Sequence, residues 1–112
     1  MARFIVTYLA PAKAAMEAMM NATPEQKAEG MKPWMAWMES CGEALIDGGA
    51  PLMAQGNLTK EGWNQANTNV TGYSILEAAD LDAAKKLVDG HPHLDWIEGC
   101  EINIFQAMAM EM

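Results

Sequence analysis

The first regular pattern along the chain is a run of strand-forming side chains from Arg3 to Leu9, which stops before Pro11. Phe, Ile, Val, Thr and Tyr favour β-strands, and successive side chains of a strand point to opposite faces. The alternation predicts two faces, with Phe4, Val6 and Tyr8 on one and Arg3, Ile5, Thr7 and Leu9 on the other. Because both faces hold apolar groups, we expect neither to be simply solvated.

A helix is predicted to begin near Pro24, after an Ala- and Met-rich stretch at 12–20. Thr23-Pro24-Glu25-Gln26 supplies an N-cap, a proline at the first helical position and a glutamine that completes a capping box. Pro33 lacks a backbone donor, so we expect a break or a kink near 30–32 and a restart at Pro33. The restarted helix is expected to end at Gly48-Gly49 and carries one apolar stripe: Trp34, Trp37, Met38, Cys41 and Leu45.

The second half of the chain predicts three strands and one helix. The expected segments are a short strand at 50–54, a strand at 70–78, a helix that starts at Asp80 and ends before Gly90, and a strand at 100–105. The polar stretch between 57 and 69 shows no clear pattern, with room for an edge strand near Trp63.

The predicted order of elements is β-α-β-β-α-β, which is the ferredoxin-like arrangement of an α+β fold. Two helices are then expected on one face of a four-stranded antiparallel sheet, in a single domain spanning 1–112 with a frayed tail at 108–112. The other sheet face, with Ile5 and Leu9, needs a cover, and a second copy of the chain is the natural one. Two such sheets face to face form a dimeric α+β barrel whose interior has room for a small molecule.

The charge balance limits the classes of partner. The net charge is −8 at pH 7, and the seven basic residues are scattered, so nucleic acid is not expected as a partner. No apolar run is long enough to span a membrane or to serve as a signal peptide, and we therefore expect a cytoplasmic protein. In that compartment Cys41 and Cys100 are expected as reduced, buried thiols, although a pairing between them stays open.

Eleven methionines are the unusual feature of the composition, and several fall at helical spacing. Methionine is a flexible side chain that fills irregular gaps in cores, which is the simpler interpretation here. The same flexibility suits an adaptable, methionine-lined binding pocket, which is the alternative.

Several short segments resemble the YCII-related, or DGPF-domain, family of small bacterial proteins. They are 72–78 followed by 80–84, His91-Pro92-His93-Leu94, Gly99-Cys100-Glu101-Ile102, Thr23-Pro24-Glu25 and the tryptophan-bearing helix ending in Gly48-Gly49. The resemblance implies a dimeric α+β barrel. The Asp-Gly-Pro-Phe motif that names the family is absent between Gly56 and Gly72, so no role of that loop is carried over. Most members have no established activity, and a few resemble cofactor-independent enzymes in which a histidine and an aspartate act on an aromatic or hydroxylated substrate.

Reactive side chains concentrate at His91-Pro92-His93-Leu94-Asp95. In an extended segment, His91, His93 and Asp95 would point to the same side, and a His-Asp pair suits general acid–base catalysis. Two alternatives remain: a zinc site made of the same three residues, and a plain helix-to-strand connection whose histidines bond to backbone. Metal ligation is the weaker of these, because the chain has no further histidine.

Two functional hypotheses follow from these residues. The first is a cofactor-independent enzyme in which His91 or His93 acts as a base, oriented by Asp95, on a small metabolite, with an aromatic compound as one candidate. The second is a non-catalytic homodimeric module that binds a small molecule or a protein. In either case four side chains are candidates to line the ligand pocket, on the sheet face or at its rim: Arg3, Tyr8, Trp34 and Tyr73.

Overall fold

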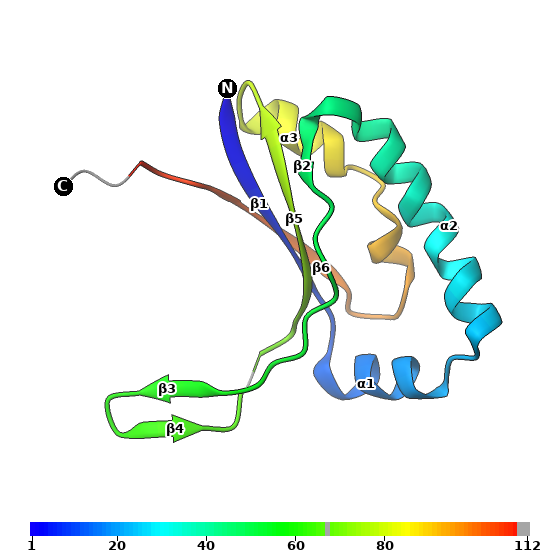
Figure 1. The fold of residues 1–112 in the computed structure, drawn as a ribbon, viewed down its shortest axis with the longest axis vertical. Coiled ribbons are helices and arrows are strands. Elements are labelled where there is room, and N and C mark those ends of the chain that lie inside the picture. Colours follow the sequence, from blue (N-terminus) through cyan, green and yellow to red (C-terminus); the bar gives the residue numbers. More distant parts are fainter. Residues whose placement is uncertain (67, 110–112) are drawn as a thin grey trace.

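The computed structural model describes residues 1–66 and 68–109 and shows an α+β fold (Figure 1). The strands are β1 (Ala2–Leu9), β2 (Leu45–Asp47), β3 (Asn57–Thr59), β4 (Gly62–Asn64), β5 (Val70–Ala78) and β6 (Glu101–Gln106). The helices are α1 (Ala12–Asn21), α2 (Pro24–Cys41) and α3 (Leu81–Val88), with 3-10 turns η1 (Gly42–Ala44) and η2 (Pro92–Asp95). Residues 110–112 of the predicted frayed tail lie outside the described residues, as does residue 67 of the polar stretch.

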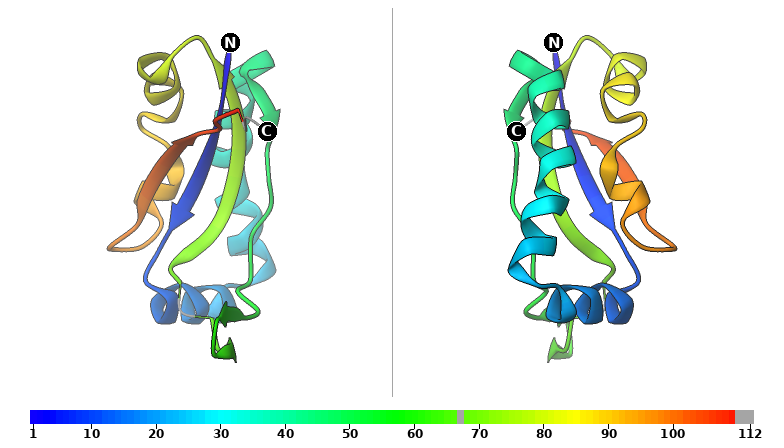
Figure 2. Two further views of the ribbon diagram at one scale, coloured as in Figure 1. Left: turned by 90° about the vertical axis from the view of Figure 1, so that its left-hand side faces the viewer. Right: turned by 90° about the vertical axis from the view of Figure 1, so that its right-hand side faces the viewer.

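Four strands form one antiparallel sheet in the order β2-β5-β1-β6, and β3 pairs only with β4. Figures 1 and 2 show α2, α3 and η2 on one face of this sheet and α1 across its lower end. The opposite face carries no helix in the part of the chain that the structure describes (Figure 2). The sheet therefore has a helix-covered face and an open face.

The alternation predicted for the first strand is confirmed by burial. Phe4, Val6 and Tyr8 are buried beneath the helices, whereas Ile5 on the other face remains 37% exposed. Ile5 pairs with Ile75 on β5 and with Phe105 on β6, and Phe105 is 53% exposed. The open face thus carries an apolar row across three neighbouring strands.

The predicted start of the long helix is confirmed, whereas a break, one of the two outcomes expected near 30–32, does not occur. Thr23 and Gln26 form a capping box with bonds of 2.9 and 3.1 Å, and α2 then runs without interruption through Pro33 to Cys41. Pro33 leaves the carbonyl of Glu29 without its usual helical donor. This part of α2 is exposed, so water can bond to that carbonyl and the helix continues.

The helix ends earlier than predicted, and the second strand lies elsewhere. Gly42, with φ of 56°, ends α2, and Leu45 belongs to β2 instead of the helical stripe. The expected strand at 50–54 is a loop that touches the sheet through one bridge, between Pro51 and Gly72. The backbone N–H of Leu52 ties this loop to β5 by donating to the carbonyl of Thr71 over 2.9 Å. The loop can lie this close because Gly49 has no side chain: a Cβ there would lie 1.6 Å from the carbonyl oxygen of Tyr73.

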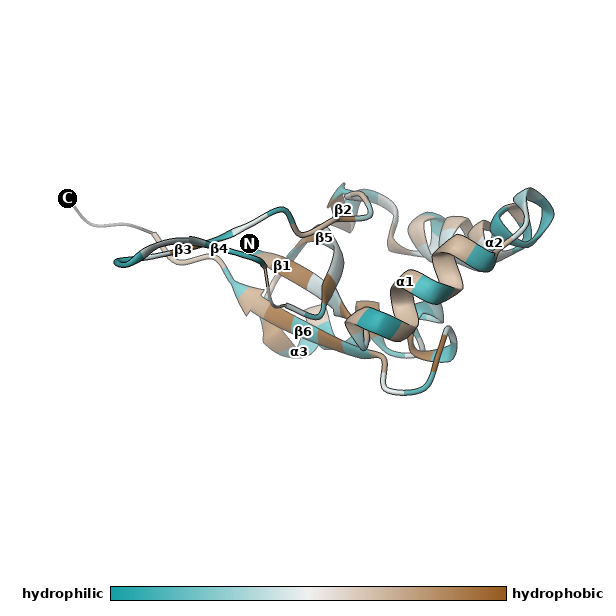
Figure 3. Cartoon of the chain, turned by 90° about the horizontal axis from the view of Figure 1, so that it is seen from below, coloured by the Kyte–Doolittle hydropathy of each residue, from teal (hydrophilic) through white to brown (hydrophobic). Residues whose placement is uncertain are grey.

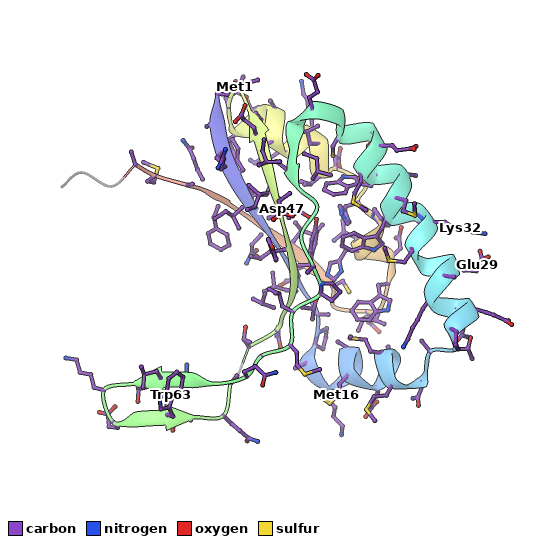
Figure 4. The ribbon with its side chains drawn as sticks, viewed as in Figure 1. Met1, Met16, Glu29, Lys32, Asp47 and Trp63 are labelled. Atoms are coloured by element: carbon purple, nitrogen blue, oxygen red, sulfur yellow. The ribbon has the colours of Figure 1, made fainter. Side chains whose placement is uncertain are left out.

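A hairpin occupies the polar stretch, where the sequence indicates room only for an edge strand near Trp63. β3 and β4 pair Leu58 with Trp63, and the hairpin projects beyond the sheet on the side of its open face (Figures 1 and 4). Trp63 is 74% exposed. The indole therefore lies mostly in solvent within a single chain.

The helix predicted to start at Asp80 and end before Gly90 is confirmed as α3. Asp80 caps it by accepting from the N–H of Ala83. Cys41 is buried and Cys100 half-buried, and both are free thiols. Among residues 1–66 and 68–109, no helix combines the length and apolar character needed to cross a membrane.

Candidate functional site

An open groove of about 1390 Å³ lies on the helix side of the molecule, between α1, α2 and the loop at 48–55. Figure 3 shows alternating hydrophilic and hydrophobic bands along α1, and its apolar side chains take part in the lining. Six methionines line the groove: Met16, Met19, Met20, Met31, Met38 and Met53. Figure 4 shows Met16 projecting from α1. Lys27 is the single basic residue of the lining, and the described lining contains no carboxylate.

Aromatic rings line the groove where α2 meets β1 and η2. Tyr8, Trp34, His93 and Trp96 all contribute to its lining. The ring of Trp34 lies edge-on to Tyr8 at 4.8 Å between centroids, and His93 lies 6.4 Å from Trp34 and 6.0 Å from Trp96. These contacts join β1, α2 and η2 into one aromatic surface.

The hydroxyl of Tyr8 is fixed by a relay of two hydrogen bonds, which runs from Tyr8 through Ser74 to Gly48. Ser74 donates to the carbonyl of Gly48 over 2.9 Å, so its single proton is used and the Tyr8 hydroxyl donates to Ser74 over 2.7 Å. Burial raises the pKa of Tyr8 to about 12, and the bond to Ser74 opposes this only in part. Tyr8 is therefore a neutral donor, already occupied, and is not available as an acid near neutral pH.

His91 is a core residue. Its side chain is 0% exposed and lies against Tyr8, Trp34 and Trp37 at 4.3 to 4.8 Å between ring centroids. Burial, and to a smaller extent the neighbouring His93, lower the pKa of His91 to about 4. The ring is therefore neutral near pH 7, with Nδ1 accepting from the backbone N–H of His93 over 2.9 Å. Nε2 then carries the proton, and it has no hydrogen-bond partner among the described residues.

His93 is positioned by the backbone of β1. Its Nε2 lies 2.8 Å from the carbonyl oxygen of Leu9, which only accepts, so Nε2 carries a proton and donates. The residue is buried but lines the groove. Nδ1 is the remaining ring nitrogen, and no described residue bonds to it.

Asp95 does not join either imidazole. It is exposed at the end of η2, and no hydrogen bond or ion pair links it to His91 or His93 in the described chain. The prediction of an extended 91–95 segment is wrong, because Pro92–Asp95 is a 3-10 turn that His91 caps. This turn directs both histidines inward and the carboxylate outward.

The four residues expected to bind a ligand divide into two groups. Tyr8, Trp34 and Tyr73 line the groove, and the Tyr73 hydroxyl donates to Asp47 over 3.3 Å. Arg3 does not line the groove. It lies at the start of β1 on the open face of the sheet, paired with Glu77 of β5. Met53 and Trp96 were not singled out from the sequence, because the loop at 48–55 and the turn after η2 have no periodic pattern.

No group of three His, Cys, Asp or Glu side chains with metal-binding geometry occurs in residues 1–66 and 68–109. Nδ1 of His91 and Nε2 of His93 are also occupied by protein bonds. The zinc alternative therefore gains no support from the arrangement of these donors.

The architecture is that of an α+β protein with a four-stranded antiparallel sheet and an apolar groove under its helices. A scan against family models and a search of curated proteins each found no match to this chain.

Proposed function

We propose that this chain is a small homodimeric protein of the YCII-related, ferredoxin-like type that binds a small, largely apolar ligand in the methionine-lined groove. The observation that carries the proposal is the concentration of methionines and tryptophans on an open groove. Met16, Met19, Met31 and Met53 are each between 46% and 74% exposed, so they are not filling a core. Flexible thioether side chains on an accessible apolar surface suit a ligand more than they suit internal packing.

The groove has few groups that could do chemistry. Tyr8 already donates to Ser74, His91 is enclosed by aromatic rings, and Asp95 contacts neither histidine. A catalytic base must lie within reach of the substrate, and among the described side chains that line the groove only His93 has a free ring nitrogen, Nδ1, that could accept a proton. Binding is thus favoured over the acid–base hypothesis, which now depends on His93 without its aspartate.

The proposed dimer uses the open face of the sheet. The strand order β2-β5-β1-β6 supports the ferredoxin-like assignment, in which such a face is left without helices. Ile5, Ile75 and Phe105 form an apolar row there, and the hairpin bearing Trp63 projects on the same side (Figure 1). A second copy would cover both features and leave the groove, on the helix side, accessible.

Binding can be tested by titrating the full-length protein with N-phenyl-1-naphthylamine, a neutral apolar dye whose fluorescence rises in apolar sites. We expect saturable binding that also changes the tryptophan emission, because Trp34 and Trp96 line the groove. Met31→Gln should weaken binding about three- to fivefold, since one apolar contact of roughly 1 kcal/mol is lost. Met35→Gln is the matched control, because Met35 on α2 is 58% exposed against 49% for Met31 but does not line the groove. Equal effects of the two substitutions, or no saturable binding, would refute the proposal.

A further inference from the structure

A smaller cavity of about 320 Å³ adjoins the groove between α2 and η2. Its lining consists of Gly30, Pro33, Trp34, Pro92, Asp95 and Trp96. Two of these are tryptophans, two are prolines and one is a carboxylate, so the cavity combines aromatic walls with a single negative charge. We call this cavity the tryptophan slot.

The two indoles that line the slot lie on different elements. Trp34 belongs to α2, whereas Trp96 follows η2, and each packs near His93 at 6.4 and 6.0 Å between centroids. Trp96 is 39% exposed, so its ring keeps an accessible surface. Indole is the aromatic side chain with the strongest attraction for a cation placed over its face.

The charges around the slot favour a cation. Asp95 is its only ionised residue, and no described basic residue lines it. Of the lysines on α2, Lys32 is bound to Glu29 over 2.8 Å, and Lys27 lines the groove but not the slot. The net charge of −8 adds a long-range attraction for cations and repels anions.

The slot is continuous with the groove, because Gly30, Trp34 and Trp96 line both. We propose that the tryptophan slot binds the quaternary ammonium head of an amphipathic organic cation whose apolar tail lies in the groove. A methylated ammonium fits this environment because it is weakly hydrated and needs no hydrogen-bond acceptor beyond the charge of Asp95. The placement of the tail rests on the proposed function, whereas recognition of the head depends only on the slot.

The test compares four probes at concentrations below micelle formation, using calorimetry on the full-length protein: octyltrimethylammonium, octanol, octanoate and tetramethylammonium. We expect octyltrimethylammonium to bind about tenfold more tightly than octanol, and octanoate to bind most weakly. Asp95→Asn should reduce binding of octyltrimethylammonium about three- to tenfold and leave octanol unchanged. Glu98→Gln is the control, since it removes the same charge from an exposed residue outside the slot and should change neither.

The possible failures are distinguishable. If octanol and octyltrimethylammonium bind equally, or if Asp95→Asn and Glu98→Gln act alike, the slot inference is wrong while the groove keeps its proposed role. If tetramethylammonium binds in an Asp95-dependent way but octanol does not bind, the slot inference stands and the proposed function fails. If no probe binds to a folded protein, as judged by circular dichroism, both are wrong.

Discussion

The backbone N–H of His93 donates to Nδ1 of His91 over 2.9 Å, and this one bond determines the state of the deeper ring. It requires an unprotonated Nδ1, so protonation of His91 at that nitrogen would both break the bond and bury a charge among three aromatic rings. One of the two histidines that the sequence offers as a candidate base is in this way held neutral as part of the core.

The first prediction concerns stability in acid. The pKa of His91 is about 4 in the folded protein and close to its ordinary value of 6.5 in the unfolded chain. The unfolded state therefore takes up the proton first, and the free energy of unfolding should fall as the pH drops from about 6.5 to about 4. The full loss is up to about 3 kcal/mol, since one pKa unit corresponds to about 1.4 kcal/mol.

Urea unfolding at pH 7.5 and pH 4.5 measures this loss. His91→Asn is the informative variant, because an asparagine oxygen can still accept from His93 and cap η2 but does not titrate. It should be less stable at pH 7.5, owing to the cavity it leaves between the rings, and should lose much of the pH dependence. An unchanged pH dependence in this variant would mean that another group is responsible.

The second prediction concerns the relay from Tyr8 through Ser74 to Gly48. Ser74→Ala removes the central hydroxyl and leaves the buried Tyr8 hydroxyl and the half-buried Gly48 carbonyl without their partner, which should cost about 1 to 3 kcal/mol. Tyr8→Phe removes only the terminal donor, and Ser74 keeps its bond to Gly48, so its cost should be nearer 1 kcal/mol. Thermal unfolding compares the two, with Ser40→Ala as an exposed control of a hydroxyl-to-backbone bond. A larger cost for Tyr8→Phe than for Ser74→Ala would contradict the assigned direction of the relay.

The third prediction concerns assembly. If the open face is the dimer interface, Phe105→Glu places a charge in the apolar row opposite Ile5 and should convert the dimer to a monomer at micromolar concentration. Met35→Glu adds the same charge on α2, away from that face, and should leave the dimer intact. Sedimentation velocity distinguishes these outcomes. A wild-type protein that is already monomeric would refute the proposed dimer.

The features that could be predicted from the sequence are those specified by neighbours along the chain. The alternation of Phe4, Val6 and Tyr8 with Ile5, the capping box of Thr23 and Gln26, and the cap at Asp80 all appear in the structure. Each depends on side chains within four residues of one another, so a periodic pattern or a short motif is sufficient. The spacing of the methionines belongs here too, since it allowed a lined pocket as one of two interpretations.

Tertiary structure alone decided the arrangement at the candidate site. Trp34, His93 and Trp96 come together only because α2 and η2 pack on the same face of the sheet, and the loop at 48–55 closes the groove from a third segment. The 3-10 turn that separates Asp95 from His93 is likewise stabilised by a contact with Leu9, more than eighty residues away in the chain. Sequence patterns report the face on which a side chain lies, but a cavity is defined by where faces from distant segments meet, and that depends on packing of the whole chain.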